Sequence, residues 1–267
     1  MSTALDQLFE KRKRENKAVL IGFLPAGYPT QKASQKIIRA MIDGGVDAIE
    51  IGFPYSDPVM DGPVIQEAVE HALQAGVRIA DVFATVAAVA KTGAPTLVMT
   101  YWNPVERYGV ERFAQDLAAA GGAGVITPDL TPEESRAWTE AAQAAGLETV
   151  FLVAPSSPVE RIDKVAEVTT GFIYAASTMG VTGARASVGV RAHELVDRIR
   201  ARSTSPVAVG LGVSAPDQAR EVAAYADGVI VGSAFIRLLI DAETEADGTR
   251  AVAELAGELA IATHQPR

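Results

Sequence analysis

Residues 19–52, VLIGFLPAGYPTQKASQKIIRAMIDGGVDAIEIG, contain one complete strand–helix–strand unit. A β-rich run at Val19–Phe23 ends in a turn that contains proline and glycine. Apolar residues then recur at helical spacing over Gln31–Ile42, and a second β-rich run follows at Ala48–Gly52. Two strands joined by a helix pair in parallel. The segment therefore predicts the repeating unit of an α/β fold.

The same alternation continues through the rest of the chain. Six further strands are expected at 96–100, 124–127, 148–153, 172–175, 207–210 and 228–231. Helices are expected over 4–15, 65–75, 105–120, 132–145, 158–168, 192–202, 215–225, 234–240 and 249–263. Strict alternation over eight strands predicts an α/β fold, a single (β/α)8 TIM barrel in which residues 1–267 form one domain. The extra N-terminal helix is expected to cover one barrel end, and an open doubly wound sheet is the alternative.

Composition excludes several functional classes. The chain has 24 basic and 33 acidic residues, a net charge of -9, which disfavours nucleic acid and anionic membranes as partners. It has no cysteine, so disulfides, thiolate metal sites and a cysteine nucleophile are excluded. Residues 1–17 lack the apolar core of a signal peptide, and no apolar run approaches the roughly 18 residues of a membrane span. A cytoplasmic protein is expected.

Two carboxylates are candidates for acid/base chemistry. Glu50 lies within an apolar strand, on the opposite face from Ile49 and Ile51, so it points into the barrel if those two pack outward. Burial there would raise its pKa and favour proton transfer. Asp61 follows on a loop, 53–64, that is rich in Pro and Gly. The alternatives are a structural carboxylate for Glu50 and a turn residue for Asp61.

The loops after the seventh and eighth strands are candidates for phosphate binding. They contain Gly210, Gly212, Gly232 and Ser233. Barrel enzymes often bind phosphate with these two loops and the N-terminus of a short helix, where backbone N–H groups face the anion. The alternative is that these glycines only serve tight strand-to-helix turns.

The stretch EIGFPYSDPVMDGPVIQ, residues 50–66, closely resembles the signature of the tryptophan synthase alpha subunit family. The similarity extends to FLPAG at 23–27, YWNP at 101–104, PDL at 128–130, GVTG at 180–183 and GS at 232–233. These landmarks follow the order of the family along nearly the whole chain.

The resemblance implies a lyase that cleaves indole-3-glycerol phosphate to indole and glyceraldehyde 3-phosphate by retro-aldol chemistry. It implies that Glu50 is the general acid/base and that Asp61 faces the indole N–H. Thr182 of the loop 176–189 would bond Asp61 when the site closes, and Gly183 would bind the phosphate. The other family positions around the indole, the glutamate and the rim are Phe23, Tyr101, Asp129 and Tyr174.

The resemblance also implies a partner, a beta subunit that carries pyridoxal phosphate, in an α2β2 assembly for tryptophan biosynthesis. No metal and no organic cofactor is expected in this chain. Tyr28, Trp102 and Thr178 depart from the commoner family pattern near the barrel mouth. His71, His193 and His264 lie far apart in sequence and are expected at the surface.

Two other functions remain open from the sequence. A phosphate-binding barrel could isomerise a sugar phosphate with Glu50 as an enediol base, although an epimerase would need histidine metal ligands at strand ends. A non-catalytic module that activates a partner is the other possibility, and Glu50 and Asp61 argue against it.

Overall fold

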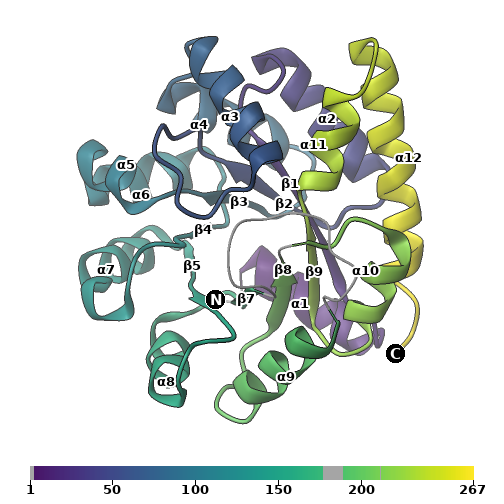
Figure 1. Cartoon of the computed structure of the whole chain (residues 1–267). Coiled ribbons are helices and arrows are strands. Elements are labelled where there is room, and N and C mark those ends of the chain that lie inside the picture. The colour runs from purple at the N-terminus through teal and green to yellow at the C-terminus, as the bar shows by residue number, and fades with distance from the viewer. Residues whose placement is uncertain (1–2, 177–188, 211) are drawn as a thin grey trace.

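The strands form one parallel sheet at the centre of the molecule (Figure 1). The computed structural model describes residues 3–176, 189–210 and 212–267. Its strands are β1 (Val19–Pro25), β2 (Ala48–Gly52), β3 (Thr96–Met99), β4 (Gly124–Ile126), β5 (Glu148–Val150), β6 (Leu152–Val153), β7 (Ile173–Ala176), β8 (Val207–Gly210) and β9 (Gly228–Val231). Their order is β5-β4-β3-β2-β1-β9-β8-β7-β6, and every pairing is parallel.

The two ends of this sheet are neighbours along the chain, so the sheet closes into a barrel. Only Phe151 separates β5 from β6. On one side, Thr127 N donates to Val150 O at 3.2 Å, and on the other, Tyr174 N donates to Phe151 O at 3.0 Å. β5 and β6 are therefore the two halves of the expected strand 148–153. The predicted (β/α)8 barrel is confirmed, and the open sheet is excluded.

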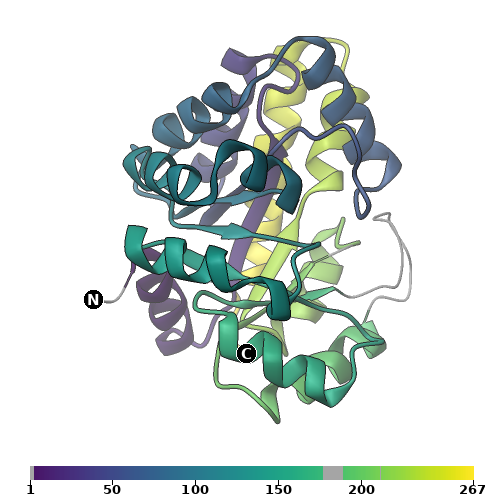
Figure 2. The same cartoon turned by 90° about the vertical axis from the view of Figure 1, so that its left-hand side faces the viewer.

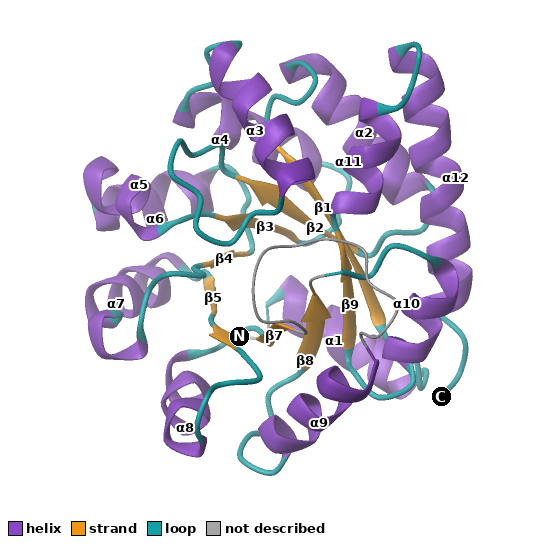
Figure 3. Ribbon diagram, in the orientation of Figure 1, coloured by secondary structure: helices purple, strands orange, loops and turns teal. Residues whose placement is uncertain are grey.

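The helices lie outside the strands (Figure 3). They are α1 (Ala4–Arg14), α2 (Gln31–Asp43), α3 (Pro63–Gln74), α4 (Ile79–Ala90), α5 (Trp102–Tyr108), α6 (Val110–Ala119), the 3-10 helix η1 (Pro132–Glu134), α7 (Arg136–Ala145), α8 (Val159–Val168), α9 (Gly189–Arg200), α10 (Pro216–Ala223), α11 (Ser233–Ile240) and α12 (Glu245–Thr263).

Three helical segments differ from the sequence prediction. Helix α4 was not expected, yet its buried side chains recur at helical spacing. The helix expected over 105–120 is interrupted at Gly109, whose φ of 98° breaks the helical backbone between α5 and α6. The helix expected from Pro132 begins as η1 and becomes α7 only at Arg136.

Buried side chains separate into two clusters, one on each side of the barrel wall. Ile49 and Ile51 belong to the cluster that packs against the surrounding helices. Ala48 of the same strand belongs to the cluster that fills the barrel. Because side chains alternate along a strand, Glu50 points inward with Ala48. The expected orientation of Glu50 is confirmed.

Helix α1 closes the amino-terminal end of the barrel. Leu5 and Phe9 are buried within the interior cluster, and the Phe9 and Phe172 ring centroids lie 5.6 Å apart. A capping box between Thr3 and Asp6 starts the helix. Figure 2 shows α1 at one end and the blue loop between β2 and α3 at the opposite end. The N-terminal helix therefore covers one barrel end, as expected, and leaves the other for the site.

The histidines are not all surface residues. His71 and His193 are exposed, as expected. His264 is half-buried at the end of α12, and its Nε2 lies 2.8 Å from Asp47 Oδ2. The expectation for His264 is therefore wrong, because the C-terminal segment packs on the loop before β2 and pairs this ring with a buried carboxylate.

Among the described residues, no single helix is long and apolar enough to cross a membrane. Helices α3 and α4 are long and apolar enough only when taken together, and the two are bent by 112° relative to each other.

Candidate active site

Glu50 occupies the interior of the barrel near its carboxyl-terminal end. Its side chain is 1% exposed, and its Oε2 has no hydrogen-bond partner among the described residues. Burial, together with the smaller effect of the nearby Asp61 charge, raises the pKa of Glu50 to about 8. A structural carboxylate would be tied to a donor. Glu50 instead holds a proton at neutral pH inside the site.

Asp61 reaches the same region from the loop between β2 and α3. The residue directly precedes Gly62, the N-cap of α3, and Gln66 Nε2 donates to its backbone carbonyl at 2.8 Å. Burial raises the pKa of Asp61 to about 6, and a hydrogen bond from the Tyr101 side chain opposes this shift. Asp61 is therefore ionised at neutral pH, while Glu50 keeps its proton.

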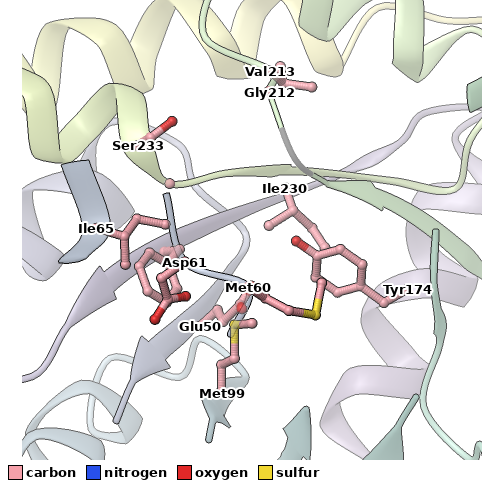
Figure 4. Close-up of a pocket in the computed structure, with 12 residues that line it drawn as sticks. Glu50, Met60, Asp61, Ile65, Met99, Tyr174, Gly212, Val213, Ile230 and Ser233 are labelled. Atoms are coloured by element: carbon pink, nitrogen blue, oxygen red, sulfur yellow. The ribbon is translucent and has the colours of Figure 1, made fainter. Parts of the chain in front are cut away.

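A cavity joins these two carboxyl groups to the loops after β8 and β9. Its lining residues are Phe23, Glu50, Met60, Asp61, Ile65, Met99, Tyr174, Gly212, Val213, Ile230, Gly232 and Ser233. Figure 4 shows Glu50 and Asp61 on one side of this space, with Ser233, Gly212 and Val213 on the other. Apolar side chains line most of this space and polar groups lie at both ends, which suits a small ligand with an apolar body and two polar ends.

The end of the cavity opposite the carboxylates has the features of an anion site. Helix α11 begins at Ser233, so its free N–H groups and the positive end of its dipole face the cavity. Gly212 adopts a φ of +104°, which a residue with a side chain rarely reaches. These features support phosphate binding by Gly212, Gly232 and Ser233.

Gly210 has a different role from the other loop glycines. A Cβ added there would lie 2.1 Å from the Tyr174 hydroxyl oxygen, so the tyrosine ring crosses directly over this backbone position. Tyr174 is buried, and burial raises its pKa well above the usual value. The lack of a side chain at Gly210 therefore leaves room for the Tyr174 ring beside Glu50. Gly210 itself is not among the residues that line the cavity.

Replacing Gly210 with alanine is expected to displace Tyr174 and distort the site. We expect kcat/KM to fall at least about tenfold and the free energy of unfolding to drop by about 1–3 kcal/mol, because overpacking forces neighbours to move. Steady-state kinetics and chemical denaturation measure both. Gly257→Ala is the matched control, because its added Cβ would meet nothing closer than 3.8 Å. Wild-type behaviour of Gly210→Ala would show that the ring does not need this glycine.

Besides Gly210, two predicted site residues lie outside the cavity. Tyr101 is buried behind the loop that contains Asp61. Asp129 is exposed, and its carboxylate accepts the Trp102 backbone N–H at 2.9 and 3.1 Å, at the start of α5. Thr182 and Gly183 lie outside the described residues, as does Thr178.

Five apolar lining residues were not predicted from the sequence. They are Met60, Ile65, Met99, Val213 and Ile230. Strand alternation could have identified Met99 and Ile230. Met99 lies two residues after the inward-facing Leu97, and Ile230 lies two residues after Gly228, where an added Cβ would face Ala208 and Phe9 of the interior. Met60 directly precedes Asp61, so the loop that brings the carboxylate also brings an apolar wall.

The described parts of the chain contain no group of three or more His, Asp or Glu side chains that could hold a metal ion.

Comparison with known proteins finds one family. The profile described as tryptophan synthase alpha chain matches residues 9–264. The alpha chain of Streptomyces avermitilis is 59% identical over 249 residues, covering 93% of this chain and 90% of the relative. That of Streptomyces coelicolor is 56% identical over 257 residues, covering 96% and 95%.

Solved structures agree with the sequence comparison. A Mycobacterium tuberculosis tryptophan synthase structure has a TM-score of 0.93 and 49% identity, covering 99% of this chain and 100% of that one. The alpha subunit from Legionella pneumophila has a TM-score of 0.89 and 32% identity, covering 98% and 99%.

Proposed function

Because the chain belongs to the tryptophan synthase alpha chain family, we propose that Glu50 and Asp61 carry out its lyase reaction. The family acts in tryptophan biosynthesis and cleaves indole-3-glycerol phosphate to indole and glyceraldehyde 3-phosphate. One observation carries the assignment: a protonated carboxyl group and an ionised one line the same cavity, with their pKa values at about 8 and about 6. When the surroundings of two carboxyl groups separate their pKa values in this way, the group with the higher pKa is the one that can act as the acid.

The proposed reaction begins with proton transfer from Glu50 to C3 of the indole ring. Positive charge then develops at the indole nitrogen, where the Asp61 carboxylate accepts the N–H hydrogen bond and stabilises it. Cleavage of the bond between C3 and the glycerol chain returns its electron pair to the ring. The carbinol hydroxyl loses its proton as the aldehyde forms, and the Glu50 carboxylate left by the first step takes it up.

The phosphate is proposed to bind at the opposite end of the cavity. Gly212, Gly232 and the N-terminus of α11 at Ser233 would hold it through backbone N–H groups, with the Ser233 hydroxyl as an additional donor. Gly183 would add a further N–H, and Thr182 would bond Asp61 in the closed site. Phe23 lies between two glycines: added Cβ atoms on Gly52 and Gly232 would come within 2.6 and 3.0 Å of its ring. That fit supports a role for Phe23 as a flat apolar wall for the indole.

The reaction should show a bell-shaped dependence of kcat/KM on pH. Glu50 must be protonated, so activity is lost as pH rises through its pKa of about 8. Asp61 must be ionised, so activity is lost as pH falls through its pKa of about 6. Because kcat/KM reports groups in the free enzyme, the maximum is expected near pH 7. A profile that still rises above about pH 9 would contradict Glu50 as the acid.

The chain is further proposed to act as one domain, 1–267, in the cytoplasm with a tryptophan synthase beta subunit. Several matching structures are described as M. tuberculosis tryptophan synthase, two of them in aminoacrylate-bound forms. Pyridoxal phosphate would belong to the beta subunit, and the assembly would be α2β2. Sedimentation of the mixed subunits tests this: a complex of two copies of each supports it, and separate species would overturn it.

A further inference from the structure

The Tyr101 hydroxyl lies against the backbone of the loop that contains the catalytic aspartate. Met60 N donates to this hydroxyl oxygen at 3.0 Å, across 41 residues of sequence. The backbone amides of Val59 and Asp61 also face the oxygen. Three successive loop residues are therefore organised around one side-chain atom.

The same hydroxyl lies close enough to Asp61 to influence its ionisation. The Tyr101 side chain hydrogen-bonds Asp61, and this bond lowers the pKa of Asp61 against the effect of burial. Burial raises the pKa of Tyr101 to about 12, so the hydroxyl keeps its proton wherever the enzyme is active. The phenol thus accepts the Met60 N–H and keeps its own proton available for the Asp61 side chain.

Tyr101 is itself held in place from the outer side. It precedes α5 as the N-cap, and the next residue, Trp102, donates its backbone N–H to the Asp129 carboxylate. The Tyr55 ring lies 5.4 Å from the Tyr101 ring, and Asn103 Nδ2 donates to the Tyr55 hydroxyl at 2.9 Å. The start of α5 therefore anchors the loop at two points, of which only Tyr101 reaches Asp61.

We propose that Tyr101 is a positioning residue for the lyase reaction, because its hydroxyl orients the Asp61 carboxylate toward the indole N–H. Tyr101 does not line the cavity, so this role differs from direct contact with the substrate. The proposal rests on the proposed function of Asp61. Asp129 contributes indirectly, by fixing the backbone from which Tyr101 extends.

Tyr101→Phe removes only the hydroxyl and tests the proposal. We expect kcat to fall about ten- to a hundredfold, the effect of losing a hydrogen bond to a charged group. KM is expected to change less than threefold, because the phosphate-binding end is untouched. The acidic limb of the kcat/KM profile should move up by roughly one pH unit, because Asp61 loses the donor that favours its charged form.

Tyr55→Phe is the matched control, since it removes a loop-anchoring hydroxyl that does not contact Asp61. Its acidic limb should stay at the wild-type position. Circular dichroism of both variants confirms folding. An unchanged acidic limb in Tyr101→Phe, or an equal shift in Tyr55→Phe, would overturn the proposal. The proposed role of Asp61 itself is tested separately with Asp61→Asn. If Asp61→Asn stayed active, the role of Asp61 in the reaction would be wrong, whatever Tyr101→Phe shows.

Discussion

Glu50→Gln is expected to abolish cleavage of indole-3-glycerol phosphate while the barrel stays folded. Glutamine matches glutamate in shape but has no proton to give to C3, and loss of a positioned acid typically costs about 100- to 10,000-fold. Indole release in a single-turnover assay measures the effect. Glu148→Gln is the control, because Glu148 is also buried but begins β5, at the opposite end of the barrel. Substantial indole release by Glu50→Gln would contradict the assignment.

Glu50→Gln should also be more stable than the wild type at alkaline pH. The pKa of Glu50 is about 8 in the folded protein, against an ordinary value of about 4.5 that applies to the unfolded chain. The folded protein therefore binds this proton more tightly than the unfolded chain does. Its contribution to stability is complete below about pH 4.5 and is lost as pH rises through about 8. The loss is on the order of 3–5 kcal/mol. Denaturation at several pH values should show this loss in the wild type and a smaller one in Glu50→Gln.

Asp61→Asn is expected to lower kcat by about 100- to 1,000-fold. The amide leaves positive charge at the indole nitrogen without a counter-charge, and removal of one such electrostatic stabiliser has this typical cost. The substitution also removes a negative charge that raises the pKa of Glu50. The basic limb of any residual activity should therefore move to lower pH.

Asp57→Asn provides the control for the loop. Asp57 is exposed and accepts a hydrogen bond from the adjacent Ser56 hydroxyl at 2.6 Å. Its substitution should leave both limbs of the pH profile in place. If Asp57→Asn and Asp61→Asn lowered activity equally, the loss would come from a disturbed loop and not from the missing charge of Asp61.

The barrel could be predicted from the sequence because its signal is local and repeated. Each strand is a short β-rich run closed by a turn, and each unit gives the same pattern. Helix α4 was missed because the segment 79–90 is mostly Ala, Val and Ile, which gives little contrast between its faces. The break at Gly109 needs a backbone with positive φ, and a glycine alone does not show which conformation it adopts.

The site was predictable only where chemistry distinguishes a residue from the core. Glu50 stands out because a carboxylate in an apolar strand is unusual, whereas Asp61 lies where Asp-Gly turns are common and was singled out by the family resemblance. Met60 and Met99 line the cavity, but in sequence they look like any other core residue. The role of Tyr101 depends on a contact 41 residues away in the chain, which no local pattern reports. Gly210 fitted a phosphate loop, whereas the structure places it under Tyr174.

Infrared difference spectroscopy of the wild type against Glu50→Gln tests the protonation state of Glu50 most directly. A buried acid at this position predicts the carbonyl stretch of a protonated carboxyl group at pH 7, disappearing as pH rises through about 8. A carboxylate signal already complete at pH 7 would contradict Glu50 as the proton donor.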